Sequence, residues 1–186
     1  MEALLVSIGV VALAEIGDKT QLLALILAAR FRKPAPIVAG ILVATLVNHG
    51  LAGALGAWLM GVAGPVIMRW VLGISFLAMA VWTLIPDKIE DEETQVAKKL
   101  GVFGATLVTF FLVEMGDKTQ IATVALAAHY GTPLFVILGT TAGMLLADVP
   151  AVFVGNRYAA KIPLRLVHAI AAAILDRKST RLNSSH

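Results

Sequence analysis

The chain has 186 residues, of which 59% are hydrophobic and 15% charged, with a formal net charge of +3 and no cysteine. Soluble globular domains average about 45–50% apolar and about 25% charged residues, so the composition, with its mean hydropathy of +0.86, excludes that class. It also excludes a disordered chain, a nucleic-acid-binding protein, a disulfide scaffold and a thiolate metal site. We therefore expect an all-α, polytopic membrane protein whose few charges are informative.

A membrane-spanning helix needs about 20 mostly apolar residues. Five segments are apolar over such a length, although the third is short unless it extends back to residue 65: Ala3–Ala29, Ala35–Met60, Trp70–Ile85, Gly101–Ala128 and Leu134–Val154. A sixth apolar segment begins at Leu166 and ends at Leu175, which is too short to span. The polar residues 176–186 then follow abruptly and resemble translated adapter or vector sequence, with a genuine polar C-terminal tail as the alternative. We therefore expect a six-span protein with a truncated sixth helix and a non-native tail.

Lys and Arg in the short loops predict how the chain is oriented in the membrane. Nine of them lie in the loops that follow the first, third and fifth spans: Arg30, Arg32, Lys33, Lys88, Lys98, Lys99, Arg157, Lys161 and Arg165. The opposite side has Arg69 alone. Because basic loops stay in the cytoplasm, this asymmetry predicts an N-terminus outside the cell and three cytoplasmic basic loops.

The sequence repeats itself at an offset of 99 residues. Residues 15–21 (EIGDKTQ) match residues 114–120 (EMGDKTQ) at six of seven positions, and the register continues in three further pairs: Pro34 and Pro133, Gly40 and Gly139, Gly56 and Gly155. Each repeat contains three spans, an odd number, so the second copy must enter the membrane from the opposite side. We therefore expect two inverted three-helix repeats, 1–85 and 100–175, joined by an acidic cytoplasmic linker over 86–99.

The acids of the two motifs lie near the middle of their spans, where each charge costs about 2.5–3.5 kcal/mol on insertion scales. Glu15 and Asp18 would share one face of a continuous helix, with Gln21 one turn further on. The second motif repeats this pattern with Glu114, Asp117 and Gln120. Two such faces would offer four carboxylates and two amide oxygens. Oxygen ligands suit a hard divalent cation such as Ca²⁺, Mg²⁺ or Mn²⁺, and not Cu⁺ or Zn²⁺.

Four carboxylates in one small volume cannot all stay ionised after the cation leaves, so some must take up protons or pair with another cation. This exclusivity favours metal/proton antiport, in which the same carboxylates hold either the ion or protons. Two alternatives use the same acids: a structural ion-pair network between the two halves, and a passive divalent-cation channel. We do not expect an enzyme, because neither a histidine-containing ligand set nor an activated nucleophile lies near the motifs. The sequence also has no phosphate-binding Gly-rich loop of the kind that an ATP-driven pump needs.

Each motif also contains a lysine. Lys19 follows Glu15 by four residues and Lys118 follows Glu114 by four, in the order that favours an ion pair along one helix. We interpret both lysines as internal counter-charges that stabilise the empty site or compete with the metal. The alternative is that the lysines extend towards a membrane interface.

The small residues of the motifs have two interpretations each. Gly17 and Gly116 favour either local unwinding that exposes carbonyl oxygens as extra ligands, or close helix packing. Thr20 and Thr119 would either donate hydrogen bonds to a carboxylate or bond back within their own helix. The sequence alone does not decide between these alternatives.

Three more polar residues interrupt otherwise apolar spans. Asn48 and His49 lie in the second span, and Asp148 lies at the position of the fifth span that corresponds to His49. A carboxylate at this depth needs a partner or a watery cavity. These side chains are candidates for a proton relay, since histidine titrates near neutral pH, and interhelical hydrogen bonding is the alternative.

The doubled Glu-x-Gly-Asp-Lys-Thr motif resembles the signature of the Gdt-one family, also called uncharacterised protein family sixteen, and the resemblance covers nearly the whole chain. It implies a cation/proton exchanger for Mn²⁺, or alternatively Ca²⁺. The short loops, without an organelle-targeting extension, favour a bacterial inner-membrane member that exports the metal from the cytoplasm. The metal would be the transported substrate, with no cofactor, and no oligomeric state is implied. The cation-binding acids implied by the family are Glu15, Asp18, Glu114 and Asp117, and the residues that complete the motifs are Lys19, Thr20, Lys118 and Thr119.

Overall fold

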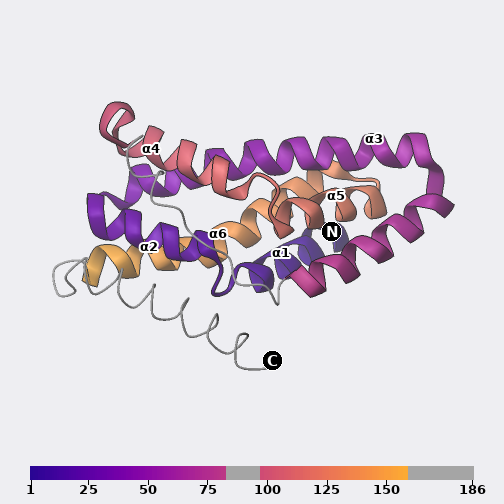
Figure 1. Ribbon diagram of the computed structural model, residues 1–186, viewed down its shortest axis with the longest axis horizontal. Coiled ribbons are helices and arrows are strands. Elements are labelled where there is room, and N and C mark those ends of the chain that lie inside the picture. The colour runs from indigo at the N-terminus through magenta and orange to yellow at the C-terminus, as the bar shows by residue number, and fades with distance from the viewer. Residues whose placement is uncertain (83–96, 159–186) are drawn as a thin grey trace, which may run out of the picture.

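The computed structural model describes residues 1–82 and 97–158, and over these residues the chain is helical and has no strand (Figure 1). The all-α prediction is therefore confirmed. The helices are α1 (Glu2–Glu15), α2 (Lys19–Phe31), α3 (Pro34–Trp82), α4 (Ala97–Glu114), α5 (Lys118–Tyr130) and α6 (Pro133–Tyr158). Most of the predicted linker, the predicted sixth helix and the predicted tail lie outside the described residues.

Within the described residues, two helices are long and apolar enough to cross a membrane, Pro34–Gly64 and Pro133–Tyr158. A third candidate span is the bent pair Leu100–Glu114 and Lys118–Tyr130. These three segments correspond to the second, fifth and fourth predicted spans. Their length and composition are those of a helical membrane protein.

The first and fourth predicted spans are not continuous helices, which corrects the sequence-based expectation. The chain leaves the helix between α1 and α2 at Gly17 (φ +78°) and between α4 and α5 at Gly116 (φ +81°). Glycine occupies this left-handed region without the steric cost that a Cβ brings. At the second break the two helices meet at a 72° bend. Of the two interpretations of the motif glycines, the structure shows local unwinding.

A third glycine reverses the chain inside α3. Gly64 has φ 71° and ψ 170°, and the part of α3 after this residue runs back in the opposite direction to the part before it (Figure 1). The reversal separates the second predicted span from the third, which includes the helical residues 70–82.

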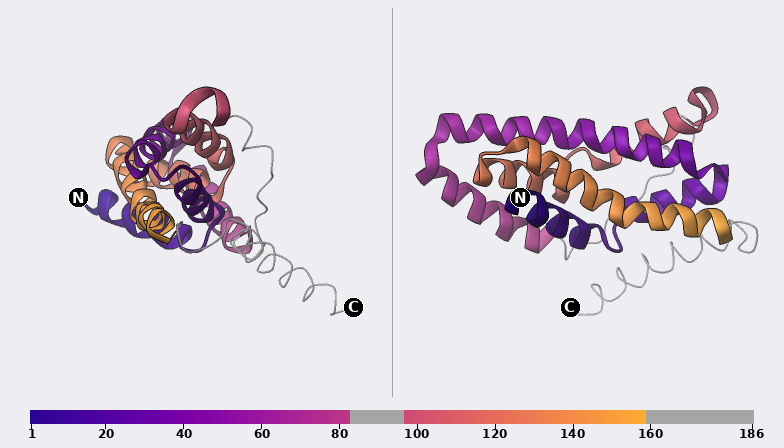
Figure 2. Two further views of the ribbon diagram at one scale, coloured as in Figure 1. Left: turned by 90° about the vertical axis from the view of Figure 1, so that its left-hand side faces the viewer. Right: turned by 180° about the vertical axis from the view of Figure 1, so that it is seen from behind.

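The helices of one sequence repeat pack mainly against those of the other. In the first repeat α1 and α2 lie along α6 of the second, and α4 and α5 lie along α3, as the view from behind in Figure 2 shows. A Cβ on Gly40 would lie 3.0 Å from the Phe103 carbonyl oxygen, whereas one on Gly139 would lie 2.6 Å from that of Leu4. Adding 99 to Gly40 and subtracting 99 from Phe103 converts the first contact into the second.

A second pair of glycine contacts repeats in the same way. A Cβ on Gly56 would overlap the Val124 carbonyl oxygen, and one on Gly155 would lie 2.5 Å from the carbonyl oxygen of Leu25. Small residues allow helix backbones to approach this closely. The recurrence means that the two repeats contact each other through equivalent surfaces.

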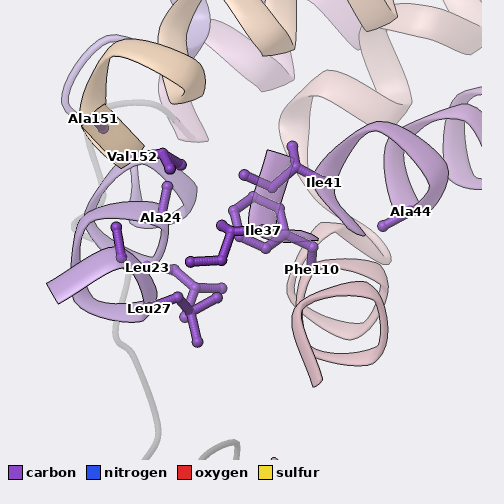
Figure 3. Packing of buried hydrophobic residues seen from close by; sticks show 10 residues of the cluster. Leu23, Ala24, Leu27, Ile37, Ile41, Ala44, Phe110, Ala151 and Val152 are labelled. Atoms are coloured by element: carbon purple, nitrogen blue, oxygen red, sulfur yellow. The ribbon is translucent and has the colours of Figure 1, made fainter. Parts of the chain in front are cut away.

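An apolar cluster joins four helices beside the motifs (Figure 3). Phe110 lies one turn before Glu114 on α4, and Leu23 follows Thr20 by three residues on α2. The buried members of the cluster are Leu23, Ala24, Leu27, Ala28, Ile37, Ile41, Ala44, Phe110, Ala151 and Val152. Because these side chains exclude polar groups, electrostatic interactions beside them are stronger than in water.

Candidate metal centre

Both motifs form the same local structure around the helix break. Glu15 is the last residue of α1, and Asp18 is the N-cap of α2. In the second motif Glu114 ends α4, and Asp117 caps α5. The two acids of each motif therefore lie on either side of a break, and the expectation that they share one face of a continuous helix is wrong.

The motif glutamines stabilise the breaks. Gln21 Oε1 accepts a hydrogen bond from the Gly17 N–H at 3.0 Å, and Gln120 Oε1 accepts one from the Gly116 N–H at 2.7 Å. Gln21 Nε2 also donates to the Ala147 carbonyl of α6 at 3.1 Å. A helix break leaves backbone N–H groups without helical partners, and these side chains supply them. The amide oxygens that the sequence suggested as cation ligands thus already accept hydrogen bonds from the backbone.

Three acids from the two motifs converge on one buried position. One carboxylate oxygen from each of Glu15, Glu114 and Asp117 lies within 4.8 Å of the other two. All three side chains are buried, with exposed fractions of 0%, 0% and 1%. One oxygen of each glutamate, Oε1, has no hydrogen-bond partner among the residues that the structure describes. This arrangement can present several oxygen ligands to a single hard cation.

The motif lysines pair with the opposite motif. Lys118 Nζ donates to Asp18 Oδ1, and Lys19 Nζ lies 2.9 Å from Asp117 Oδ1. The predicted ion pairs within one helix are therefore wrong, because each break turns the lysine away from the glutamate that precedes it. Asp18 lies outside the three-acid cluster, whereas Asp117 belongs to the cluster and also pairs with Lys19.

The motif threonines donate to carboxylates, which is one of the two interpretations of their sequence positions. The Thr20 hydroxyl donates to Glu15 Oε2. The Thr119 hydroxyl lies 3.2 Å from Glu114 Oε2 and 3.4 Å from Asp117 Oδ2. Hydrogen bonds of this kind fix the orientation of a carboxylate and leave its second oxygen available.

The three second-tier residues all lie at the site. Asn48 Nδ2 donates to the Phe111 carbonyl of α4 at 3.0 Å, three residues before Glu114. His49 and Asp148 are fully buried, and neither has a hydrogen-bond partner within residues 1–82 and 97–158. His49 interacts electrostatically with Asp117, and Asp148 with Asp18 and both motif glutamates. Asp148 is thus a fifth acid beside the cluster.

Buried hydroxyls are the feature of the site that sequence reasoning missed. Ser7, Thr45 and Thr141 are buried, and their side-chain oxygens lack hydrogen-bond partners in the described part of the chain. The spacing of Ser7 and Thr141 from the acids of their own helices indicates their place at the site. Ser7 precedes Glu15 by eight residues and Thr141 precedes Asp148 by seven, which places each pair on one helical face.

Comparison with known proteins identifies the family. The sequence model of the GDT1 family, described as divalent cation/proton antiporters, matches residues 3–91 and 102–175 of this chain. A Vibrio cholerae serotype O1 protein named "Putative manganese exporter" is 53% identical over 175 residues, which cover 94% of this chain and 86% of that protein. GDT1-like protein sll0615 of Synechocystis is 30% identical over 179 residues, which cover 81% of this chain and 84% of that protein.

A plant relative, GDT1-like protein 3 of Oryza sativa subsp. indica, is 29% identical over 199 residues, which cover 93% of this chain and 70% of that protein. No solved structure matches the chain. The family consists of transporters and not enzymes, and the metal is a transported substrate and not a cofactor. By the match over most of its length, the chain belongs to the GDT1 family of divalent cation/proton antiporters.

Proposed function

We propose that the chain exports Mn²⁺ from the cytoplasm in exchange for protons, with Ca²⁺ as the alternative cargo. The observation that carries the proposal is the buried cluster of Glu15, Glu114 and Asp117, in which both motifs contribute oxygen ligands. Carboxylate oxygens suit Mn²⁺ and Ca²⁺ equally in kind. The name of the Vibrio cholerae relative, a manganese exporter, favours Mn²⁺. An inward proton gradient would drive the metal outwards.

Exchange with protons follows from the charges at the site. Five buried acids, the four of the motifs and Asp148, face the two motif lysines. When the cation leaves, this excess of negative charge cannot remain in an apolar surrounding, so protons must take its place. We propose that Glu15 and Glu114 are the acids that alternate between cation and proton, since each belongs to the three-acid cluster and also has one oxygen without a hydrogen-bond partner in the described chain.

Lys19 acts in this scheme as an internal competitor of the metal. It lies 2.9 Å from Asp117 Oδ1, while Asp117 also supplies an oxygen to the three-acid cluster. A divalent cation in the cluster would weaken this pair, and its departure would restore it. Lys118 and Asp18 form the equivalent pair on the other side of the site.

We further propose that the two repeats have inverted topology, with the N-terminus outside and the basic loops in the cytoplasm of a bacterial inner membrane. The repeated glycine contacts, in which equivalent residues exchange roles, support a two-fold relation between the repeats. The figures support the inversion, because α1 and α2 run through the molecule against the direction of α4 and α5 (Figure 1). The positive-inside rule supports the orientation.

The proposal is tested with purified protein in liposomes that contain a Mn²⁺-sensitive dye and, in parallel samples, a pH-sensitive dye. Under an imposed pH gradient we expect Mn²⁺ flux with proton flux in the opposite direction. Glu15→Gln and Glu114→Gln should abolish both, whereas Glu2→Gln, at an exposed acid, should leave both unchanged. Mn²⁺ flux without proton flux would instead favour the passive channel, and unchanged flux in the two motif variants would contradict the site.

A further inference from the structure

We infer that two rows of buried polar side chains are water-lined access paths to the carboxylate cluster, and that they open to opposite faces of the molecule. The inference rests on the proposed function, because only a transported ion needs a path from each side. The first row lies between α1 and α6 and contains Ser7, Thr141 and Asp148. The second row follows α3 beside α4 and contains Thr45, Asn48 and His49.

The first row leads directly to the acids. Ser7, Val11 and Glu15 are the buried residues of one face of α1, spaced by four. On α6, Thr141 lies two turns before Asp148 on the buried side. The two helices run in the same direction, because a Cβ on Gly139 would lie 2.8 Å from Ser7 Cβ and one on Gly143 would lie 3.0 Å from Val11 Cβ. Both hydroxyls therefore lie at the same side of the cluster.

The second row is built on the equivalent helix pair. Thr45 lies one turn before His49 on α3, and both are fully buried. The row follows α4 towards the cluster, since Gly40 lies against Thr106 and Asn48 Nδ2 donates to the Phe111 carbonyl. Thr106 is the residue that corresponds to Ser7 at the offset of 99.

Apart from the Asn48 amide nitrogen, the polar side-chain atoms of both rows lack the protein partners that buried polar groups almost always have. The unpartnered atoms, within the described residues, are Ser7 Oγ, Thr45 Oγ1, Asn48 Oδ1, both ring nitrogens of His49, Thr141 Oγ1 and both carboxylate oxygens of Asp148. A purely structural interface between apolar helices would be more stable with alkyl side chains at these positions. Polar side chains that face the interior of a membrane bundle are typical of a solute pathway.

The two rows extend from the cluster in opposite directions. The first reaches towards the N-terminal ends of α1 and α6, and the second towards those of α3 and α4. Figure 1 places these two sets of helix ends towards opposite ends of the long axis of the molecule, right and left respectively. Because all six side chains are at least 96% buried, the structure is closed at both ends. Opening along α1 and α6 would expose the site to one side, and opening along α3 and α4 to the other.

The experiment uses the natural absence of cysteine. Single variants Ser7→Cys, Thr141→Cys and Thr45→Cys are treated with a membrane-impermeant, positively charged methanethiosulfonate, in intact cells and in inverted membrane vesicles. The matched controls are Leu5→Cys and Val47→Cys, which lie two residues away on the exposed surfaces of the same helices. We expect the first two variants to react at least tenfold faster from one side, and Thr45→Cys at least tenfold faster from the other.

Reaction of all three variants from the same side, or at the control rate from both, would overturn the inference. Radiolytic hydroxyl-radical labelling of the unsubstituted protein is independent of variant folding. Met144, fully buried beside the first row, should be oxidised, whereas Leu23 in the apolar cluster should be protected relative to the unfolded chain. Protection of Met144 equal to that of Leu23 would also overturn it. Neither readout needs transport, so absent Mn²⁺ flux with labelling from opposite sides would contradict the proposed function alone.

Discussion

Asp117 shows at the scale of single residues how the site combines two demands. Its carboxylate contributes an oxygen to the cluster with Glu15 and Glu114, and it pairs with Lys19 from the other motif. Thr119 donates to the same side chain from the first turn of α5. The position of this aspartate at the N-cap of α5 makes these contacts possible, because the cap residue lies outside the helix and faces the opposite break.

The buried pair of Lys118 and Asp18 gives a prediction at this scale. Removing one partner of a buried ion pair costs about 3–5 kcal/mol, because an uncompensated charge remains. We therefore expect Lys118→Met to lower the free energy of unfolding by this amount, and Lys118→Met with Asp18→Leu to restore most of it. Chemical denaturation in mixed micelles measures the difference. Lys33→Met, at an exposed lysine, is the control, and a double variant less stable than Lys118→Met would contradict the pairing.

Each motif acid could be identified from the sequence, but its partner could not. A doubled acidic heptapeptide inside apolar spans is a strong local signal, and it pointed to all four acids. The lysine partners were mispredicted because helical spacing was extended across residues 16–18, where the chain is not helical. The pairing of Lys19 with Asp117 joins residues 98 apart, which no local pattern encodes.

At the scale of helices, glycine has two structural roles: some glycines allow a helix to break, and others allow two helices to pack closely. Gly17 and Gly116 have positive φ and open space around them, so they allow the breaks through backbone freedom alone. Gly40 and Gly139 lie in regular helix, and their missing side chains let another backbone approach. The sequence predicted both possibilities for the motif glycines, because a single glycine in an apolar helix is compatible with either.

Substitution of the contact glycines tests this distinction. In Gly139→Ala the new Cβ would lie 2.6 Å from the Leu4 carbonyl oxygen, so α1 must move away from α6. We expect a loss of about 1–3 kcal/mol of stability, as in other overpacked interfaces, and a similar loss in Gly40→Ala. Gly9→Ala, where the added Cβ would meet no atom within 4 Å beyond its own chain neighbours and the adjacent backbone of α1, should gain about 0.5–1 kcal/mol. Equal stabilities for all three variants in a thermal unfolding series would contradict the packing.

At the scale of the whole molecule, the two repeats interlock. The broken pair of each repeat packs along the long helix of the other, so α3 supports α4 and α5 while α6 supports α1 and α2. The order of the apolar segments predicted the helices, and the offset of 99 predicted which ones are equivalent. The sequence does not predict that the broken pair of one repeat packs on the long helix of the other, because the same helices would also suit two separate three-helix bundles.

Interlocking predicts that neither repeat is stable alone. We expect residues 1–91 and 92–186, expressed as separate chains in one cell, to co-purify and to bind Mn²⁺ together. Each segment expressed alone should be degraded or aggregate, because its helices lack the surfaces that cover them. Size-exclusion chromatography with Mn²⁺ titration measures both outcomes. A segment that purifies alone as a stable monomer would contradict the interlocked packing.

The most direct test of the account is the number of protons released when Mn²⁺ binds to the purified protein in weakly buffered solution. If the same carboxylates hold the metal or protons, binding must release protons, and the Mn²⁺ affinity must fall as the pH is lowered. We expect release from the unsubstituted protein that decreases in Glu15→Gln and Glu114→Gln together with Mn²⁺ affinity. Mn²⁺ binding without proton release would contradict the shared site. So would two variants that each release as many protons as the unsubstituted protein.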